Sequence, residues 1–413
     1  AERCLSHFIK KERTMAPKKL TTIEDLDRFY QLFCQVFKKE DTAQFRKSFL
    51  EMHANGTVLG ITKNSQLLSG LAWWHFEVSF QGVSYKMGAV GSVMTAPFAR
   101  GQGSATQLLQ AALAQMAEAG VTLSYLDPFS HAFYRRLGYG AAIKRLYYTI
   151  DPAQLQLPTP LVSRSQQATG GNLQTGPLSR YLDKVAPFYA QQLTHKSGGL
   201  LRPKWWWEHL HAVGTKVGCY LNAQQQLEGY FLYQELKESW VVKEWLVTNI
   251  IAEKNLLQLL HAQKQSLNQL IFESDETLYR GQLLNEPLAL SAQVKPFMMV
   301  RIINLRDFIL HYPFKKLDFG ELSLAVTDPQ LPQNDGLWRL CAKNGCVSFK
   351  KCGSAAQAAD ISLPIAEFGP LFGGQYSLEW AAFQQKISVS APYQAAKLQT
   401  VLLASPVSFN DDF

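Results

Sequence analysis

Two hydrophobic periods organise the first 100 residues. Near the start, five apolar residues recur at helical spacing and predict an amphipathic helix behind a Thr21-x-x-Glu24 capping box: Ile23, Leu26, Phe29, Phe33 and Phe37. A second helix is expected over residues 42–54. From residue 57 to Pro97 the period changes to two, which predicts three antiparallel strands separated by short turns.

The last of these strands, residues 83–95, runs into a turn of small residues. Arg100-x-x-Gly103-x-Ala105 precedes a predicted helix over 104–118, and Gly120 lies where a C-terminal cap belongs. A helix that begins on small residues leaves its first N–H groups unbonded and turns the positive end of its dipole outward. The stretch is therefore an expected anion site suited to a pyrophosphate. A strand, turn and helix can also carry such glycines without a ligand.

The pattern continues with a strand, a short helix and another strand, and then repeats after a polar connection over 151–175. These first elements are expected at 121–126, 130–139 and 146–150. In the repeat, helices are expected at 182–193, 203–210 and 255–270, and strands at 216–221, 227–236 and 240–247. No glycine turn follows Val247, so no cofactor is expected in the repeat. A third region opens with a strand at 298–303 and holds further strands and helices at 363–372 and 391–403.

Composition adds exclusions to this picture. The chain of 413 residues is 47% hydrophobic and 18% charged, which is typical of a globular chain of about two to four domains. The net charge of +8 is partly concentrated in residues 1–19, and no basic stripe interleaved with aromatic residues indicates nucleic-acid binding. No apolar run is long enough for a membrane span, and a cytoplasmic location is expected. The six cysteines form no C-x-x-C pair, so buried reduced thiols and no metal site are expected.

Two segments carry a family resemblance. The stretch Val93-Met94-Thr95-Ala96-Pro97 with Arg100-Gly101-Gln102-Gly103-Ser104-Ala105 resembles the acetyl-CoA motif of the GNAT N-acetyltransferases. Phe133-Tyr134-Arg135-Arg136-Leu137-Gly138-Tyr139 resembles the F-Y-x-x-x-G-Y/F segment that follows the fifth strand of that fold. The plan of the whole chain resembles the enhanced intracellular survival (Eis) family of bacterial N-acetyltransferases.

The resemblance implies an α/β fold with mixed sheets and three domains. It implies a GNAT catalytic domain (15–150), a degenerate GNAT-like domain (151–297) and a sterol-carrier-protein-like domain (298–413). Residues 1–14 lie outside the resemblance and are expected to form an N-terminal extension, because Met15 is followed directly by the first predicted element. The resemblance also implies a homo-oligomer, for which a hexamer is one form.

The same resemblance implies acetyl transfer from acetyl-CoA to a primary amine of an aminoglycoside, a polyamine or a lysine-like acceptor. Tyr134 matches the general acid, and the carboxylate of Phe413 matches the general base. The residues that match the cofactor site are Val93, Met94, Thr95, Arg100, Gly101, Gln102, Gly103, Ser104 and Ala105. Gly101 and Gln102 stand where the family often has arginine. The candidate acceptor-binding residues are Phe33, Trp73, Trp74 and Asp412.

Purely structural interpretations of these residues stay open beside the catalytic and binding roles. Tyr134 and the two tryptophans suit core packing, and Asp411 and Asp412 suit a solvated end. The alternative function is a non-catalytic protein that retains the fold and binds coenzyme A, a lipid or a partner.

Overall fold

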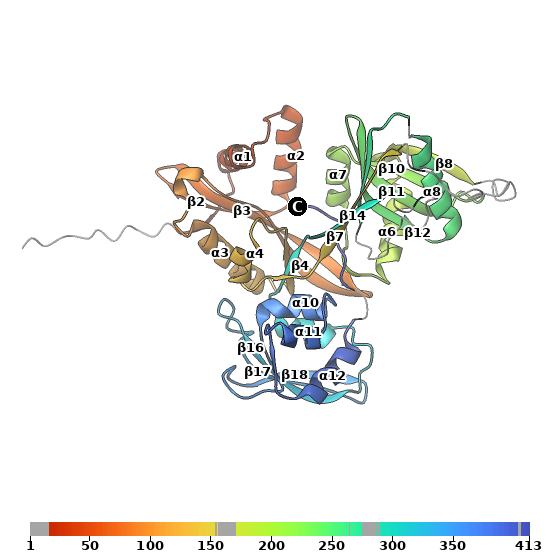
Figure 1. Ribbon diagram of the computed structural model, residues 1–413. Coiled ribbons are helices and arrows are strands. Elements are labelled where there is room, and N and C mark those ends of the chain that lie inside the picture. Colours follow the sequence, from red (N-terminus) through yellow and green to blue (C-terminus); the bar gives the residue numbers. More distant parts are fainter. Residues whose placement is uncertain are drawn as a thin grey trace, which may run out of the picture. The chain divides into compact units, whose positions relative to one another are not determined.

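The structure, a computed structural model, describes residues 16–152, 155, 171–263, 265–274, 286, 290–403 and 406–413. The expected N-terminal extension and most of the 151–175 connection lie outside these residues. Within the described residues the chain divides into two compact units, one formed by residues up to Trp73 together with Ser92–Ala112, the other by Trp74–Gly91 together with Leu113–Phe413. Each unit is described separately. The strands form three mixed sheets with helices on their faces (Figure 1).

In the first unit, two capped helices follow a short strand. The elements are β1 (Lys18–Lys19), α1 (Ile23–Phe37), α2 (Ala43–Ala54) and β2 (Thr57–Lys63). The predicted capping box is wrong by one residue, because Thr22 is the N-cap and its hydroxyl accepts from the Asp25 N–H at 3.1 Å. Thr42 caps α2 in the same way. β2 pairs antiparallel with both β1 and β3, as the meander predicts.

Three long elements run from one unit into the other, and they carry the stretch that the sequence singles out. They are β3 (Gln66–Phe80), β4 (Val83–Thr95) and, after a 3-10 turn at Pro97–Ala99, α3 (Ser104–Glu118). The predicted bounds of β4 and α3 agree with the structure. Leu108, Leu109 and Leu113 on the inner face of α3 are fully buried, which explains why the helix forms here.

The first sheet continues in the second unit around a parallel pair. Its further elements are β5 (Leu123–Leu126), α4 (His131–Arg135), β6 (Gly140–Ala141), β9 (Ser197–Leu200) and β15 (Met299–Ile302). β5 pairs in parallel with β4, from Met87 opposite Leu123 to Val90 opposite Leu126. β15 pairs with β5 and β6, and β9 pairs with the end of β3. The strand expected to open the third region thus lies in the first sheet.

The second sheet repeats the parallel pair of the first. Its strands, in spatial order, are β14 (Ser291–Pro296), β7 (Lys144–Ile150), β13 (Gln269–Ser274), β12 (Ser239–Val247), β11 (Leu227–Leu236), β10 (Lys216–Leu221) and β8 (Asn172–Pro177). Its helices are α6 (Leu182–Leu193), α7 (Lys204–Ala212) and α8 (Ile250–Ala262), with a 3-10 turn at Leu178–Arg180. β12 and β13 are parallel. The strand expected at 146–150 therefore pairs outside the first sheet.

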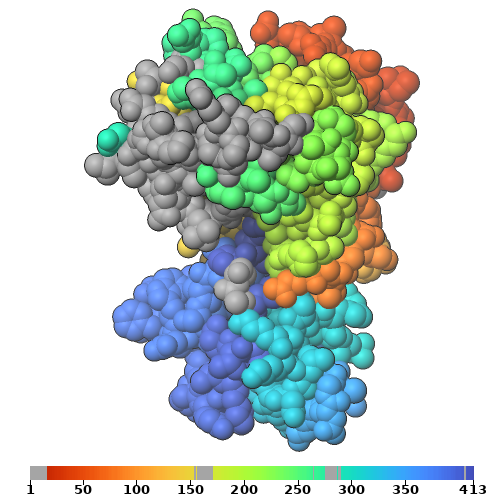
Figure 2. All heavy atoms as spheres, turned by 90° about the vertical axis from the view of Figure 1, so that its right-hand side faces the viewer, coloured from red at the N-terminus to blue at the C-terminus, as the bar shows by residue number. Residues whose placement is uncertain are grey.

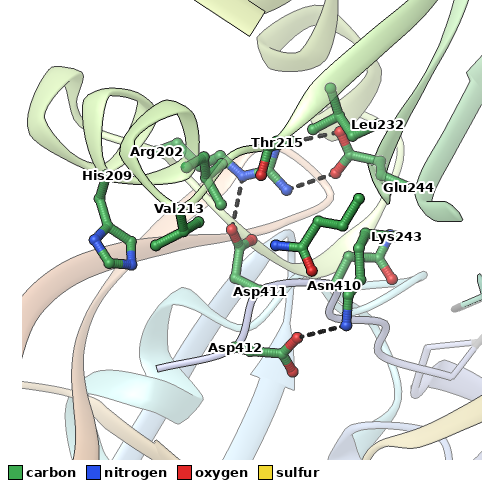
Figure 3. Close-up of a pocket in the computed structure, with 12 residues that line it drawn as sticks. Arg202, His209, Val213, Thr215, Leu232, Lys243, Glu244, Asn410, Asp411 and Asp412 are labelled. Carbon is green, nitrogen blue, oxygen red and sulfur yellow. Dashed lines mark hydrogen bonds and ion pairs between the residues drawn. The ribbon is translucent and has the colours of Figure 1, made fainter. Parts of the chain in front are cut away.

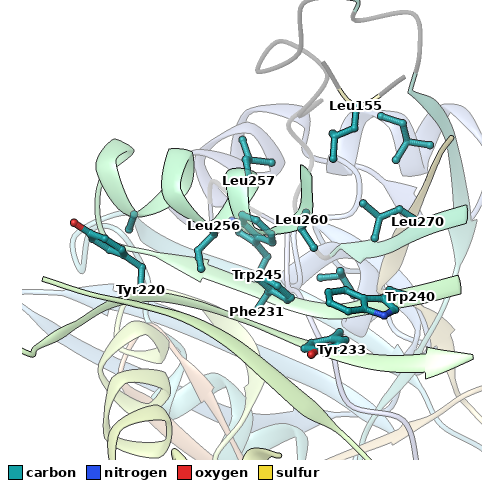
Figure 4. Packing of buried hydrophobic residues seen from close by; sticks show 13 residues of the cluster. Leu155, Tyr220, Phe231, Tyr233, Trp240, Trp245, Leu256, Leu257, Leu260 and Leu270 are labelled. Carbon is teal, nitrogen blue, oxygen red and sulfur yellow. The ribbon is translucent and has the colours of Figure 1, made fainter. Parts of the chain in front are cut away.

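The helix predicted at 255–270 is wrong in its bounds. α8 begins at Ile250 behind the N-cap Asn249, and residues 269–274 form a strand instead. Figure 4 shows Leu256, Leu257 and Leu260 of this helix over Phe231 and Trp245 of the sheet, whose rings stack 5.2 Å apart. The helix ends early because this core, and the pairing of residues 269–272 with β12, override the local apolar pattern.

A third sheet closes the chain. Its strands are β16 (Gly320–Thr327), β17 (Gly336–Lys343), β18 (Cys346–Gly353), β19 (Ile361–Pro364) and β20 (Ser388–Val389). The helices beside it are α9 (Leu305–His311), α10 (Phe368–Phe372), α11 (Leu378–Phe383) and α12 (Pro392–Val401), with a 3-10 turn at Ile365–Glu367. These cyan and blue residues are contiguous on the face shown in Figure 2. The expectation of buried thiols is wrong for β18, an edge strand that exposes Cys346 and Cys352.

Candidate active site

The parallel pairing of β4 with β5 ends at Val90, and the next residue, Gly91, lies against two other groups. Pairing stops where Leu126 ends β5, so among the described residues β4 continues past Gly91 without that neighbour. A Cβ placed on Gly91 would lie 3.0 Å from the carboxyl carbon and an oxygen of Phe413, and 3.1 Å from Cζ3 of Trp74. Only a glycine allows this approach. The strand end, an aromatic wall and a carboxyl group therefore meet at one point of the second unit.

The continuation of β4 in the first unit has an irregular backbone. Ser92 has a φ of 53°, a backbone conformation that residues other than glycine rarely adopt. Its hydroxyl lies 3.0 Å from Nε2 of His53, whose Nδ1 lies 2.7 Å from the Phe49 carbonyl oxygen. Beyond it Met94 is buried, whereas Val93 and Thr95 are half-buried. Val93 and Thr95 therefore keep part of their surface exposed, and Met94 packs into the core.

The turn after β4 has the geometry of an anion cradle. Gly101 and Gly103 have φ values of 77° and 78°, and a Cβ on either would meet no atom within 4 Å. Arg100 and Gln102 are exposed, Ser104 is buried and Ala105 half-buried. The first bond of α3 runs from the Gln107 N–H to the Gly103 carbonyl oxygen, so three earlier N–H groups precede it. Such groups, open space and a basic side chain fit a phosphate of coenzyme A.

Tyr134 lies on α4, a short helix in the second unit whose N-cap is Ser130. Its side chain is 1% exposed, between the rings of Phe129, Phe133 and Tyr139. Burial, with smaller contributions from Tyr139 and Asp127, raises the pKa of the Tyr134 phenol well above its ordinary value. The phenol is therefore protonated throughout the neutral range, the state that a proton donor requires.

The segment 406–413, which we call the terminal segment, is extended but largely buried. Val407, Phe409 and Asp411 alternate inward, and the Phe413 ring lies 5.7 Å from that of Phe409. A cavity of about 300 Å³ lies beside the segment, lined by residues of α7, β11, β12 and the segment itself (Figure 3). Arg202, Glu244 and Asp411 in its lining already pair with one another.

The four candidate acceptor-binding residues fall in different places. Phe33 packs in the first unit against Phe49, with ring centroids 4.7 Å apart, and Trp73 is 3% exposed. Trp74 lies at Gly91 beside Phe413, so it shares a place with one of the two expected catalytic groups. Asp412 is half exposed and lies 2.9 Å from Nη1 of Arg145. Of the four, Trp74 thus lies beside the terminal segment and Asp412 belongs to it, both within the second unit.

Sequence reasoning missed three charged residues of this site. Asp127 ends β5, and burial followed by the charge of Asp412 raises the pKa of its carboxyl group, while Arg145 and His131 lower it. Arg202 is a buried partner of Asp411 in the terminal segment, and Glu244 is the second buried partner of Arg202. Arg202 lies directly before the Pro203-Lys204-Trp205-Trp206-Trp207 motif, whose aromatic residues are the signal of burial in the sequence.

Within the ranges that the structure describes, no group of three or more His, Cys, Asp or Glu side chains could hold a metal ion. Among the helices that the structure describes, none has the length and apolar character needed to cross a bilayer.

Family models match three consecutive parts of the chain. Residues 18–142 and 198–302 each match an acetyltransferase (GNAT) domain, and residues 305–409 match a sterol carrier protein domain. No curated protein matches the chain in sequence.

Solved structures match over nearly the whole length. A protein of unknown function from Enterococcus faecalis, described as a probable N-acyltransferase, is 26% identical, with 96% of this chain and 99% of that chain covered and a TM-score of 0.86. A GCN5-related N-acetyltransferase from Anabaena variabilis is 19% identical, with 96% and 100% covered and a TM-score of 0.80. Eis1 from Mycobacterium abscessus is 17% identical, with 96% and 100% covered and a TM-score of 0.75.

These matches agree with the three mixed sheets of the fold, and the GNAT family uses acyl-CoA. The chain is a GNAT-type N-acetyltransferase of Eis-like architecture, with two GNAT domains followed by a sterol carrier protein domain.

Proposed function

We propose that the protein transfers an acetyl group from acetyl-CoA to a primary amine of an aminoglycoside, a polyamine or a lysine-like acceptor. The observation that carries the proposal is the carboxyl group of Phe413 against Gly91, at the end of the β4–β5 pair. Bound acetyl-CoA would supply the acetyl group as a thioester. The residues proposed to hold it are Val93, Met94, Thr95, Arg100, Gly101, Gln102, Gly103, Ser104 and Ala105.

The proposed general base is the Phe413 carboxylate. A protonated amine has no lone pair with which to attack a carbonyl carbon, so a base must remove a proton from it, directly or through one water. The carboxylate first takes one proton from the ammonium, which frees the lone pair of the nitrogen. As the new C–N bond forms and the C–S bond breaks, the nitrogen gives its second proton to water, and water returns one proton to the Tyr134 oxygen after the sulfur has taken the phenol proton. Trp74 beside it excludes water on one side and strengthens the interaction between carboxylate and ammonium.

The proposed general acid is Tyr134. The sulfur that leaves gains negative charge, and a proton from the phenol neutralises it. The raised pKa of Tyr134 supports this role, because the phenol keeps its proton until the thiolate forms. Asp412 of the terminal segment and its neighbour Asp127 are acidic side chains, which suits a cationic acceptor.

The experiment is an acetyl-transfer assay that detects the free thiol, run with polyamines, aminoglycosides and lysine peptides. We expect turnover with at least one acceptor class and acetyl-CoA binding in calorimetry. Removal of Phe413 should lower kcat by orders of magnitude while acetyl-CoA binding is retained. No turnover with any acceptor, but retained coenzyme binding, would favour a non-catalytic binding protein. An unchanged kcat after removal of Phe413 would exclude its carboxylate as the base.

A further inference from the structure

The terminal segment buries a charge immediately before the proposed base. Asp411 is 2% exposed, at the inward position that Val407 and Phe409 fill with apolar side chains. Its Oδ2 has no hydrogen-bond donor among the described residues, so Oδ1 carries its polar contacts. A buried carboxylate without a counter-charge is strongly unfavourable. The site of Asp411 therefore depends on the groups that meet Oδ1.

Arg202 is the counter-charge, and it is fixed on its other sides. Its Nε donates to Oδ1 of Asp411 at 2.8 Å, and its two terminal nitrogens donate to the two carboxylate oxygens of Glu244 at 3.1 and 2.5 Å. The rings of Tyr189 and Trp207 lie 4.0 and 4.7 Å from its guanidinium carbon. A guanidinium held by a fork and by two rings has little freedom to move.

Further hydrogen bonds fix the terminal segment and the partners of Arg202. Trp206 Nε1 donates to the same Oδ1 at 2.7 Å (Figure 3 shows the Arg202 contacts), and Tyr230 donates to Glu244 at 2.6 Å. Ser408 N–H donates to the Ser197 carbonyl oxygen at 2.8 Å. Arg202, Trp206 and Glu244 all come from the second GNAT domain, which lacks a glycine turn of its own.

We infer that Arg202 is a positioning residue: through Asp411 it sets the place of the Phe413 carboxylate against Gly91. The inference rests on the proposed function, because it assigns Phe413 the role of base. Only Asp412 separates Asp411 from Phe413, and two steps of extended chain span about 7 Å, so a shift of the anchor carries over to the carboxylate. A displacement of about 1 Å of a catalytic group can cost on the order of 100-fold in rate. The second GNAT domain thereby positions the proposed base, the Phe413 carboxylate.

The test is a cycle of Asp411→Ala and removal of Phe413, singly and together, in the full chain. Asp411→Ala leaves Arg202 paired with Glu244, so no new buried charge is left alone. We expect kcat to fall about 100-fold with an almost unchanged KM for acetyl-CoA. Asp411→Asn, which keeps an acceptor for Arg202 and Trp206, should restore most of the rate. In the chain without Phe413, Asp411→Ala should change the residual rate less than about twofold.

Three outcomes overturn the inference in distinguishable ways. If Asp411→Ala lowers the rate equally with and without Phe413, the ion pair acts on the structure and not through the base. A normal kcat in Asp411→Ala excludes positioning directly. An unchanged kcat after removal of Phe413 alone overturns the proposed base, and the positioning role with it.

Controls separate rate from folding. Asp328→Asn is the matched variant. Asp328 is an equally buried carboxylate that pairs with Arg301 at 2.9 Å, and neither residue belongs to the terminal segment. It should lower the melting temperature and leave kcat unchanged. If Asp411→Ala does not fold, Arg202→Lys tests the same point, because it keeps the charge and loses the fork; a wild-type kcat in that variant would overturn the inference.

Discussion

The carboxyl group of Phe413 occupies the space where a side chain on residue 91 would begin, because a Cβ placed on Gly91 would lie only 3.0 Å from the carboxyl carbon. The two residues lie at the point where β4 loses β5 as its neighbour. This contact makes Gly91 a sensitive place to move the proposed base without changing any charge.

Gly91→Ala should therefore impair catalysis more than folding. The methyl group must displace either the Phe413 carboxyl group or the Trp74 ring, and such overpacking costs about 1–3 kcal/mol of stability. We expect kcat to fall at least about tenfold, with KM for acetyl-CoA almost unchanged, in steady-state assays. Gly176→Ala is the control, because its Cβ would meet Tyr181 at a similar 3.2 Å on an edge strand far along the sequence. Equal kcat in both variants would contradict the prediction.

Tyr134→Phe should lower kcat by about 10²- to 10⁴-fold, the range for loss of a general acid. Tyr139→Phe is the matched control: this phenol is also buried, but it bonds to Ser124 at 2.8 Å and has no proposed role. The control should lose about 1 kcal/mol of stability and no activity. A rate in Tyr134→Phe equal to that of Tyr139→Phe would remove Tyr134 from the mechanism.

The pH dependence of kcat gives an independent test of Tyr134. Because burial raises its pKa, the phenol stays protonated as the pH rises through 10, the ordinary value for tyrosine. Ionisation of Tyr134 should therefore cause no fall of kcat near pH 10. The profiles of the unmodified protein and of Tyr134→Phe should have the same shape there, although their absolute rates differ. A basic limb that depends on Tyr134 would mean that its pKa is not raised in the working enzyme.

The local pattern predicted the strand, turn and helix of the proposed cofactor stretch because neighbouring residues decide their structure. The strand, the glycine turn and the amphipathic face of α3 lie within about 35 residues, and each has its own signal in the sequence. The capping box failed by one residue because Thr21 and Thr22 are equivalent as letters, and only Thr22 bonds to an N–H. Such ambiguity is a normal limit of boundary prediction.

Long-range pairing was not predictable in the same way. β7 joins the second sheet and β15 joins the first, although chain order suggests the reverse. The contact of Arg202 with Asp411 joins residues 209 positions apart, and a polar Asp-Asp pair near the end of the sequence suggests solvation. The proposed base at Phe413 came from family resemblance alone, whereas the ion pairs of Arg202 with Asp411 and Glu244 became visible only in the structure.

Thiol reactivity should distinguish the cysteines of the described residues. Burial raises the pKa of Cys219 to about 11, so at pH 8 its thiolate fraction is on the order of 10⁻³. Cys346 and Cys352 are exposed on β18. Alkylation of the native protein followed by peptide mass mapping should modify these two within minutes and Cys219 only after unfolding. Rapid modification of Cys219 in the native state would contradict the burial of β10.

Gly103→Ala should weaken acetyl-CoA binding, because the proposed cradle needs the backbone conformation of Gly103. Its φ is 78°, where an L-residue costs about 1–2 kcal/mol, and no atom within 4 Å would add a clash. If the turn relaxes to relieve that cost, its N–H groups move, and calorimetry should show a Kd raised about tenfold. Gly120→Ala is a close control: its φ is 69°, it also has open space around it, and it lies at the other end of α3. Both variants should lose similar stability, but Gly120→Ala should bind acetyl-CoA normally. Equal binding by the two variants would show that the turn does not hold the coenzyme.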